Sequence, residues 1–187
     1  MMRRALSLKD KTAVVTGGAS GIGHAIALRF AREGARVVIA DLQAEPLEVG
    51  EATHAMINAS GGEAAFVTCD VSVWADVDAA VAKAVERWGR LDIMVNNAAT
   101  YAGTPLLETP EEAWNRVMAV NATGVFFGYK WAIAHMMDQE PVDEVRGRVI
   151  NISSQHGMIS CPGDVAYGTG KAAVVYMTRQ IAADCAE

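Results

Sequence analysis

Tyr167 and Lys171 are the two residues whose types and spacing most directly suggest a reaction. They lie four positions apart, so on a helix they share one face and the ammonium can approach the phenol. A positive charge about 4 Å from a phenol stabilises the phenolate by up to ~4 kcal/mol at an effective dielectric constant of about 20. A phenol that ordinarily titrates near ~10 then becomes useful as an acid or base near neutral pH. The alternative is a surface pair that serves no reaction, since this spacing is common by chance.

A hydroxyl group stands close to this pair, at the end of an expected strand. The apolar run from 148 to 152 predicts the strand, and Ser153 and Ser154 follow it. In parallel sheets ligands bind beyond the carboxyl ends of the strands. Either serine could therefore face the reacting group, and the spacing alone leaves both open.

The segment from Thr16 to Gly23 is a candidate phosphate-binding turn. It joins an expected strand to an expected helix and carries glycines at positions 17, 18, 21 and 23. Glycines there allow a tight turn, a close approach of backbone N–H groups to a pyrophosphate, and close packing of helix on strand. The residues expected to hold a cofactor here are Gly17, Ser20, Gly21, Ile22 and Gly23. Many glycine clusters are ordinary turns, so the glycines alone leave the two interpretations equally open.

Asp41 strengthens the phosphate interpretation. It ends the second expected strand, 24 residues after Gly17 and just before Leu42. This is near the ~20-residue offset at which a carboxylate reaches the ribose hydroxyls of a dinucleotide. Such a carboxylate would repel a 2′-phosphate, and the segment from 16 to 23 contains no Lys or Arg. NAD is therefore favoured over NADP. The alternative is that Asp41 is only a solvated residue at the end of a strand.

The elements that would position these residues alternate along the chain. Short apolar runs recur with helix-like segments between them, which predicts a Rossmann-type, doubly wound parallel α/β sheet with helices on both faces. The expected strands are 12–16, 36–40, 65–68, 91–95 and 148–152. Helices are expected after the glycine turn and along Val77, Val81 and Val85. Two more are expected from Pro110 to about Met137, with Thr109 as N-cap, and from about Val165 to the end.

Composition excludes several other classes of protein. The 187 residues carry a net charge of −6 and are 51% hydrophobic, which fits one globular domain over 1–187 and opposes disorder or nucleic-acid binding. Cys69, Cys161 and Cys185 lie far apart without a C-x-x-C pair, so neither disulfides nor a metal site is expected. No apolar stretch is long enough for a membrane span. We expect a cytoplasmic protein that acts on a small molecule.

The chain resembles the short-chain dehydrogenase/reductase family from Lys9 onward. The resemblance rests on Thr16-Gly-x-x-x-Gly21-x-Gly23, Asn96-Asn97-Ala98, Asn151-Ile152-Ser153-Ser154 and Tyr167-x-x-x-Lys171, in this order. It implies a catalytic set of Asn121, Ser154, Tyr167 and Lys171, with Ser154 selected because it lies thirteen residues before the tyrosine. Tyr167 and Lys171 would also contact the cofactor.

The same resemblance implies the remaining contacts and the reaction. Asp70 and Val71 would face the adenine, and Asn97 and Ala98 would line the adenosine side. Substrate contacts would come from Ser154, Gln155, His156 and Tyr167. Tyr167 would exchange a proton with a secondary alcohol or ketone while a hydride moves to or from NAD. A sugar, polyol, steroid or oxoacyl group is compatible with these residues.

The C-terminal end of the sequence differs from the pattern of the family. Family members continue through further strands and a substrate-covering segment, so we expect that a C-terminal portion follows in the natural protein. The last two expected helices are the faces that the family uses for dimer contacts, so the resemblance implies a homodimer or homotetramer. A nucleotide-binding protein without turnover is the alternative function. A sugar-nucleotide epimerase is a weaker one, because its glycine spacing differs.

Overall fold

A parallel five-stranded sheet forms the centre of the protein in the computed structural model, which describes residues 7–142 and 144–186. The strands are β1 (Thr12–Thr16), β2 (Arg36–Asp41), β3 (Glu63–Thr68), β4 (Ile93–Asn96) and β5 (Arg148–Asn151). Their order in the sheet is β3-β2-β1-β4-β5, and every neighbouring pair is parallel. The expected fold class is thereby confirmed. The chain reverses its winding direction between β1 and β4, which is the point at which such sheets bind ligands.

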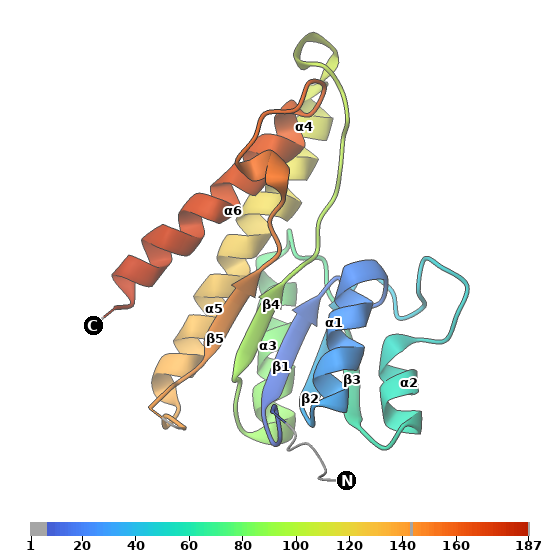
Figure 1. The fold of residues 1–187 in the computed structure, drawn as a ribbon, viewed down its shortest axis with the longest axis vertical. Coiled ribbons are helices and arrows are strands. Elements are labelled where there is room, and N and C mark those ends of the chain that lie inside the picture. The colour runs from blue at the N-terminus through green and yellow to red at the C-terminus, as the bar shows by residue number, and fades with distance from the viewer. Residues whose placement is uncertain (1–6, 143, 187) are drawn as a thin grey trace, which may run out of the picture.

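Helices cover both faces of this sheet (Figure 1). They are α1 (Gly21–Arg32), α2 (Thr53–Ala59), α3 (Trp74–Trp88), α4 (Glu111–Met118), α5 (Gly124–Asp138) and α6 (Val165–Asp184). On one face, Ala27 of α1 and Ile57 of α2 pack with Val15. On the other, Val81 of α3 and Ala132 of α5 pack with Val14. Because successive residues of β1 are buried on opposite faces, its hydrophobic run is continuous rather than alternating.

The long helix expected from Pro110 to Met137 has three parts. A single π-helical turn, Ala119–Thr123, separates α4 from α5. The prediction of Thr109 as N-cap was wrong, since Pro110 holds that position. The Thr109 hydroxyl instead donates to the carbonyl of Pro105 at 2.9 Å, within a loop that includes the short 3₁₀ turn Leu106–Glu108. The sequence analysis also missed α2, which is short and buries only Thr53 and Ile57.

The edge strand β5 is less covered than the strands at the centre. Its Ile150 is 41% exposed, whereas every residue of β1 is buried. Beyond β5, the 3₁₀ turn Gln155–Gly157 leads to α6, whose Val174 packs with Val125 and Tyr129 of α5.

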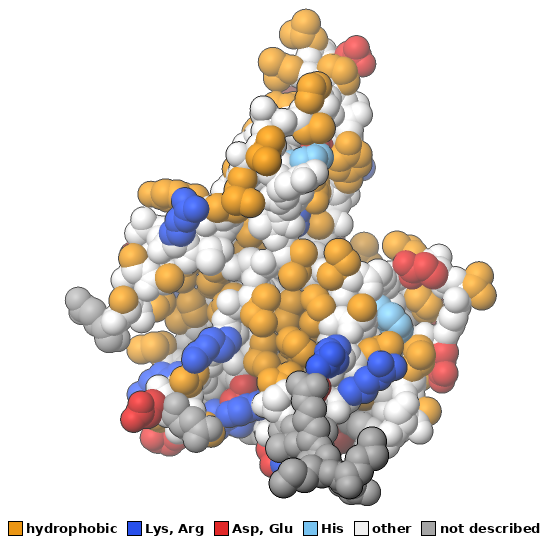
Figure 2. Space-filling model, viewed as in Figure 1, with side chains coloured by type: hydrophobic (Ala, Val, Ile, Leu, Met, Phe, Trp, Pro, Cys, Tyr) orange, Lys and Arg blue, Asp and Glu red, His pale blue; other side chains and the backbone are white. Residues whose placement is uncertain are grey.

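Figure 2 shows hydrophobic side chains gathered on the visible face of the sheet beside α1. Among the residues that the structure describes, no helix combines the length and apolar character needed to cross a membrane.

Candidate active site

A cleft of about 650 Å³ opens at the carboxyl ends of β1, β2, β3 and β4. Residues expected to bind the cofactor line much of it, namely Gly17, Ser20, Ile22, Asp41, Leu42, Asp70, Val71, Asn97 and Ala98. Gly21 and Gly23 belong to the same turn without lining the cleft. The structure therefore brings together residues from the ends of four strands, as their order in the sheet requires.

The glycine turn has a shape that side chains would destroy. Gly17 has a φ of +63°, a conformation that other residues rarely adopt. A Cβ on Gly23 would lie 2.1 Å from the carbonyl oxygen of Gly17 and 2.6 Å from Nδ2 of Asn97. The turn is therefore a closely packed backbone cradle at the N-terminus of α1, where partial positive charge favours an anion.

Two side chains hold this turn against the neighbouring strands. Asn97 donates from Nδ2 to the carbonyls of Thr16 and Gly17, at 2.9 and 3.1 Å. The hydroxyl of Thr16 accepts hydrogen bonds from the backbone N–H groups of Asn97 and Ala98 and donates to the carbonyl of Val95 at 3.2 Å. The end of β4 thus braces the turn after β1.

Asp41 faces the glycine turn and is half-buried. Its Oδ2 accepts from the N–H of Ala19 at 2.9 Å, and its Oδ1 accepts from the N–H of Leu42 at 2.8 Å. The alternative of a merely solvated strand end was wrong. A carboxylate at this wall gives the cleft a negative charge beside the start of α1.

Asp70, at the end of β3, is held in place by the segment that follows it. Its Oδ1 accepts from the N–H and the hydroxyl of Ser72, at 2.9 and 2.7 Å. Its own N–H donates to Oδ2 of Asp76 in α3. These bonds fix the wall of the cleft that Asp70 and Val71 form.

Tyr167 and Lys171 share one face of α6, as the spacing predicts. The Lys171 Nζ lies 5.7 Å from the centre of the Tyr167 ring and donates to the carbonyl of Ile152 at 2.8 Å. The lysine is only 3% exposed. Burial lowers the pKa of its ammonium from the ordinary value of 10.5. A desolvated cation next to a phenol is the arrangement that acid–base chemistry at a tyrosine needs.

The two serines after β5 have different partners. Ser153 donates to the carbonyl of Lys171 at 3.0 Å, which ties the loop to α6. Ser154 begins the 3₁₀ turn, where its hydroxyl accepts from the N–H of His156 at 3.2 Å. The first serine is therefore engaged in holding the helix, and the second retains its proton for another acceptor.

Asn121 lies in the π-helical turn and is fully buried. Its Oδ1 accepts from the N–H of Thr100, and its Nδ2 donates to the carbonyl of the same residue, both at 2.8 Å. Thr100 lines the cleft, and the ring of the adjacent Tyr101 lies 5.3 Å from that of Tyr167. Asn121 thus fixes the chain segment that joins the cleft to the tyrosine.

The loop between β5 and α6 carries Gln155 and His156, two of the four expected substrate residues. Gln155 is exposed and His156 is half-buried, with its ring 6.1 Å from that of Tyr167 and perpendicular to it. The imidazole of His156 is also held by the N-cap residue of α6. Its Nδ1 pairs with the carboxylate of Asp164.

Comparison with known proteins decides the family. Residues 11–187 match the family described as short chain dehydrogenase. The chain belongs to the short-chain dehydrogenase family. The members of this family are oxidoreductases that use a nicotinamide dinucleotide, either NAD or NADP.

Relatives and solved structures agree with this assignment. Glucose 1-dehydrogenase 2 of Bacillus subtilis (strain 168) is 40% identical over 182 residues, which cover 96% of this chain and 68% of the relative. The 2-(R)-hydroxypropyl-CoM dehydrogenase of Xanthobacter autotrophicus is 39% identical over 180 residues, covering 95% and 69%. A short-chain type dehydrogenase/reductase from Mycobacterium marinum superposes with a TM-score of 0.87 at 32% identity, covering 97% of this chain and 70% of that one. The chain thus spans about two thirds of the length of these relatives.

Several residues that line the cleft of this short-chain dehydrogenase were missed from the sequence. They are Gln43, Glu45 and Leu47 after β2, Ala99 and Thr100 after β4, and Arg116, Ala119 and Val120 in α4 and the π-helical turn. The segments after β2 and β4 could have been included, because residues that follow strand ends border such clefts. Arg116 carries no such signal, since only the packing of α4 brings it there.

The cleft does not extend to the expected reaction centre of this dehydrogenase. Ser154, Tyr167 and Lys171 are absent from its lining. Of these three, Tyr167 lies next to Tyr101, which follows the cleft residue Thr100 in the chain. The arrangement therefore has two parts, a cradle for a nucleotide and a neighbouring set of polar side chains.

Proposed function

We propose that this protein is an NAD-dependent dehydrogenase that interconverts a secondary alcohol and a ketone. The observation that carries the proposal is the buried Lys171 beside Tyr167, next to a glycine-lined cleft with a carboxylate at its wall. The cleft fits a dinucleotide because Gly17 and Gly23 allow a closely packed backbone turn at its border, at the N-terminus of α1, where a pyrophosphate is favoured. When bound, NAD supplies the hydride acceptor, and NADH the hydride donor.

Tyr167 is the proposed acid–base group. Its hydroxyl takes the proton of the substrate alcohol in oxidation and returns it to the ketone oxygen in reduction. Lys171 provides the charge that stabilises the phenolate, and its location between Ile152 and Tyr167 keeps water from screening that charge. Ser154 donates its hydroxyl proton to the reacting oxygen and stabilises the charge that develops there. Asn121 positions the Thr100 backbone at the border between cofactor and substrate.

The substrate would carry an apolar part beside its hydroxyl group. Met158 and Ile159 follow the 3₁₀ turn that holds His156, and both are more than half exposed, at 73% and 66%. Leu106 and Leu107, which precede α4, are also exposed. These side chains belong to the projecting end of the molecule, where Figure 2 shows several hydrophobic groups. A panel of secondary alcohols of increasing apolar size tests this expectation.

Replacing Tyr167 by Phe tests the reaction. The variant keeps the ring and loses the hydroxyl, so we expect NADH formation from the best alcohol of the panel to fall by at least about 100-fold, the lower range for a general acid–base group. NADH binding, followed by fluorescence, should stay within a few-fold of the parent. Tyr176→Phe is the matched control, because Tyr176 lies on the same helix and is 65% exposed. Undiminished turnover in Tyr167→Phe would contradict the assignment. Nucleotide binding without turnover in the parent chain would favour the non-catalytic alternative.

Replacing Asp41 by Asn tests the choice of cofactor. Asparagine keeps one of the two oxygens that accept backbone hydrogen bonds at this position and loses the other, and it removes the charge that would repel a 2′-phosphate. We expect the ratio of kcat/KM for NAD to that for NADP to fall by at least about tenfold, which corresponds to ~1.4 kcal/mol. Glu86→Gln on the exposed surface of α3 changes the net charge equally and should leave the ratio unchanged. A preference for NADP in the parent chain would refute this part of the proposal.

A further inference from the structure

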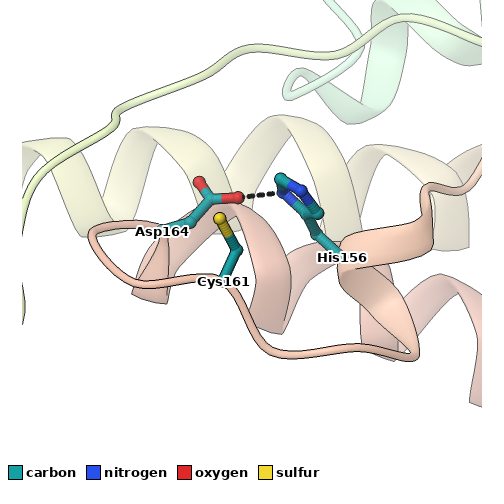
Figure 3. Close-up of side chains that lie close together, drawn as sticks. All are labelled: His156, Cys161 and Asp164. Carbon is teal, nitrogen blue, oxygen red and sulfur yellow. Dashed lines mark hydrogen bonds and ion pairs between the residues drawn. The ribbon is translucent and has the colours of Figure 1, made fainter.

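Three metal-ligating side chains meet in the loop before α6. They are His156 in the 3₁₀ turn, Cys161 in the following loop and Asp164 at the N-cap of α6. One potential ligand atom of each lies within 4.8 Å of those of the other two. Figure 3 shows the thiol and the carboxylate lying together, with the imidazole of His156 paired to the carboxylate. The sequence analysis did not anticipate this cluster, because the three residues form no familiar metal-binding spacing.

The orientation of the Asp164 side chain is not explained by the position of this residue at the N-cap of α6. A carboxylate at an N-cap ordinarily accepts a hydrogen bond from the first turn, but the side chain of Asp164 makes no such bond. It turns towards His156 instead. Asp164 is 4% exposed, and its Oδ1 is buried without a hydrogen-bond partner in the part of the chain that the structure describes. An unsatisfied buried acceptor is destabilising, and a bound cation would satisfy it.

The donor set indicates which cation would bind. An imidazole nitrogen, a thiolate and a carboxylate are the three ligand types that Zn²⁺ accepts in proteins. Mg²⁺ and Ca²⁺ require oxygen ligands, so the thiol disfavours them. Ligand atoms around a tetrahedral zinc lie roughly 3–4 Å apart, given bonds of about 2.0–2.3 Å. The cluster needs a contraction of up to about 1 Å to reach this geometry. The exposed Cys161 can supply it, because within the described residues its thiol is held by a weak hydrogen bond of 3.7 Å to the carbonyl of Pro162.

We propose that His156, Cys161 and Asp164 bind one Zn²⁺ per chain, with the fourth position open to water or another ligand. The thiol loses its proton on binding, and the metal replaces the hydrogen bond between His156 and Asp164. All three ligands lie between Ser154 and Tyr167, and the His156 ring contacts that of Tyr167. Bound zinc would therefore hold this loop in one conformation. The proposal does not depend on the dehydrogenase activity.

The test measures metal binding by the 187-residue chain without substrate or cofactor. The chain is first treated with a chelator, desalted, and titrated with ZnCl₂ alone by calorimetry. A parallel titration with CoCl₂ alone follows the near-ultraviolet charge-transfer absorption that a cobalt–thiolate bond produces. We expect one Zn²⁺ per chain and a charge-transfer band with cobalt.

Cys161→Ser should abolish that band and weaken zinc binding by more than about 100-fold, since loss of even an outer partner of a metal ligand costs ~10–100-fold. Cys185→Ser is the matched control, because Cys185 is also an exposed cysteine but lies at the opposite end of α6. Asp164→Asn should weaken binding while retaining the band, which tests the carboxylate separately. Binding of zinc by Cys161→Ser with the affinity of the parent, or absence of the band in the parent chain, would overturn the proposal. Circular dichroism shows whether each variant has the helical content of the parent.

Discussion

The glycine-lined cleft and the proposed reaction centre are formed by different kinds of group. At the end of β1 the cleft borders a backbone turn, which Gly17 and Gly23 allow to pack closely and which the side chain of Asn97 holds by hydrogen bonds. At the end of β5 the proposed reaction centre consists of side chains on α6 and on the loop before it. The first part depends on the register of adjacent strands. The second depends on how α6 packs against α4, the π-helical turn and α5. Nucleotide binding should therefore be sensitive to small backbone changes, whereas turnover should be sensitive to changes that leave binding intact.

The largest expected effect follows from Gly23→Ala. The new Cβ would lie 2.1 Å from the carbonyl oxygen of Gly17, so the turn must open. We expect NADH affinity to fall by at least about 100-fold, or ~2.8 kcal/mol, and the melting temperature to fall with it. Gly61→Ala is the control, because Gly61 has a φ of +81° and open space where its Cβ would be. It should cost about 1 kcal/mol of stability without changing NADH affinity. NADH affinity equal to that of the parent in Gly23→Ala would break the contrast between the two parts.

A smaller effect is expected from Asn121→Ala. The change removes the side-chain partner of the N–H and the carbonyl of the half-buried Thr100, at a cost of up to about 1–3 kcal/mol in the free energy of unfolding. Because Thr100 borders both parts of the site, we expect kcat to fall along with stability. The protein offers a close control in Asn58, whose side-chain amide pairs in the same way with the backbone of Ala64, at 2.8 and 3.2 Å, away from the site. Asn58→Ala should lower stability and leave kcat unchanged. Equal effects of the two variants on kcat would show that Asn121 acts on stability alone.

The smallest effect concerns the pH dependence of stability at Lys171. Burial lowers the pKa of this lysine in the folded chain from the ordinary value of 10.5. Between the two pKa values the unfolded chain binds more protons than the folded chain, so the free energy of unfolding rises with pH. Lys171→Met removes this dependence. Urea unfolding at a series of pH values from about 7 to about 10 should show the parent gaining stability relative to the variant as pH rises. A constant difference would mean that the lysine is not desolvated in solution.

Much of the nucleotide-binding part could be predicted from the sequence. The strands β1, β2 and β5 were located within a residue or two, because buried parallel strands appear as short β-branched runs. The family resemblance placed Asn97 on the adenosine side of the cleft, and the structure shows that its side chain donates hydrogen bonds to the glycine turn. The identity of Asp41 as a wall of the cleft followed from its distance along the chain after Gly17.

Less could be predicted where helices pack on one another. Nothing in the local pattern around Asn121 distinguishes a π-helical turn from a regular α-helix, and the turn places this side chain against Thr100. Gly168 and Gly170 lower helix propensity in the first turns of α6. Glycine is favoured at both positions by tertiary packing. A Cβ on Gly170 would lie 3.1 Å from the Cβ of Asn121, and a Cβ on Gly168 would lie 3.2 Å from the carbonyl oxygen of His156. These close contacts leave no trace in hydrophobic periodicity.

The amino-acid sequence by itself determined the fold class, the glycine turn and the shared helix face of Tyr167 and Lys171. These features depend on residues close together in the chain or on the repeating geometry of strands and helices. Only the tertiary structure decided that Lys171 is buried against Ile152, that Arg116 reaches the cleft, and that Asp164 turns from its helix towards His156 and Cys161. Such contacts depend on the way one element packs on another, and that packing is set by the sum of many weak interactions across the molecule rather than by any short segment.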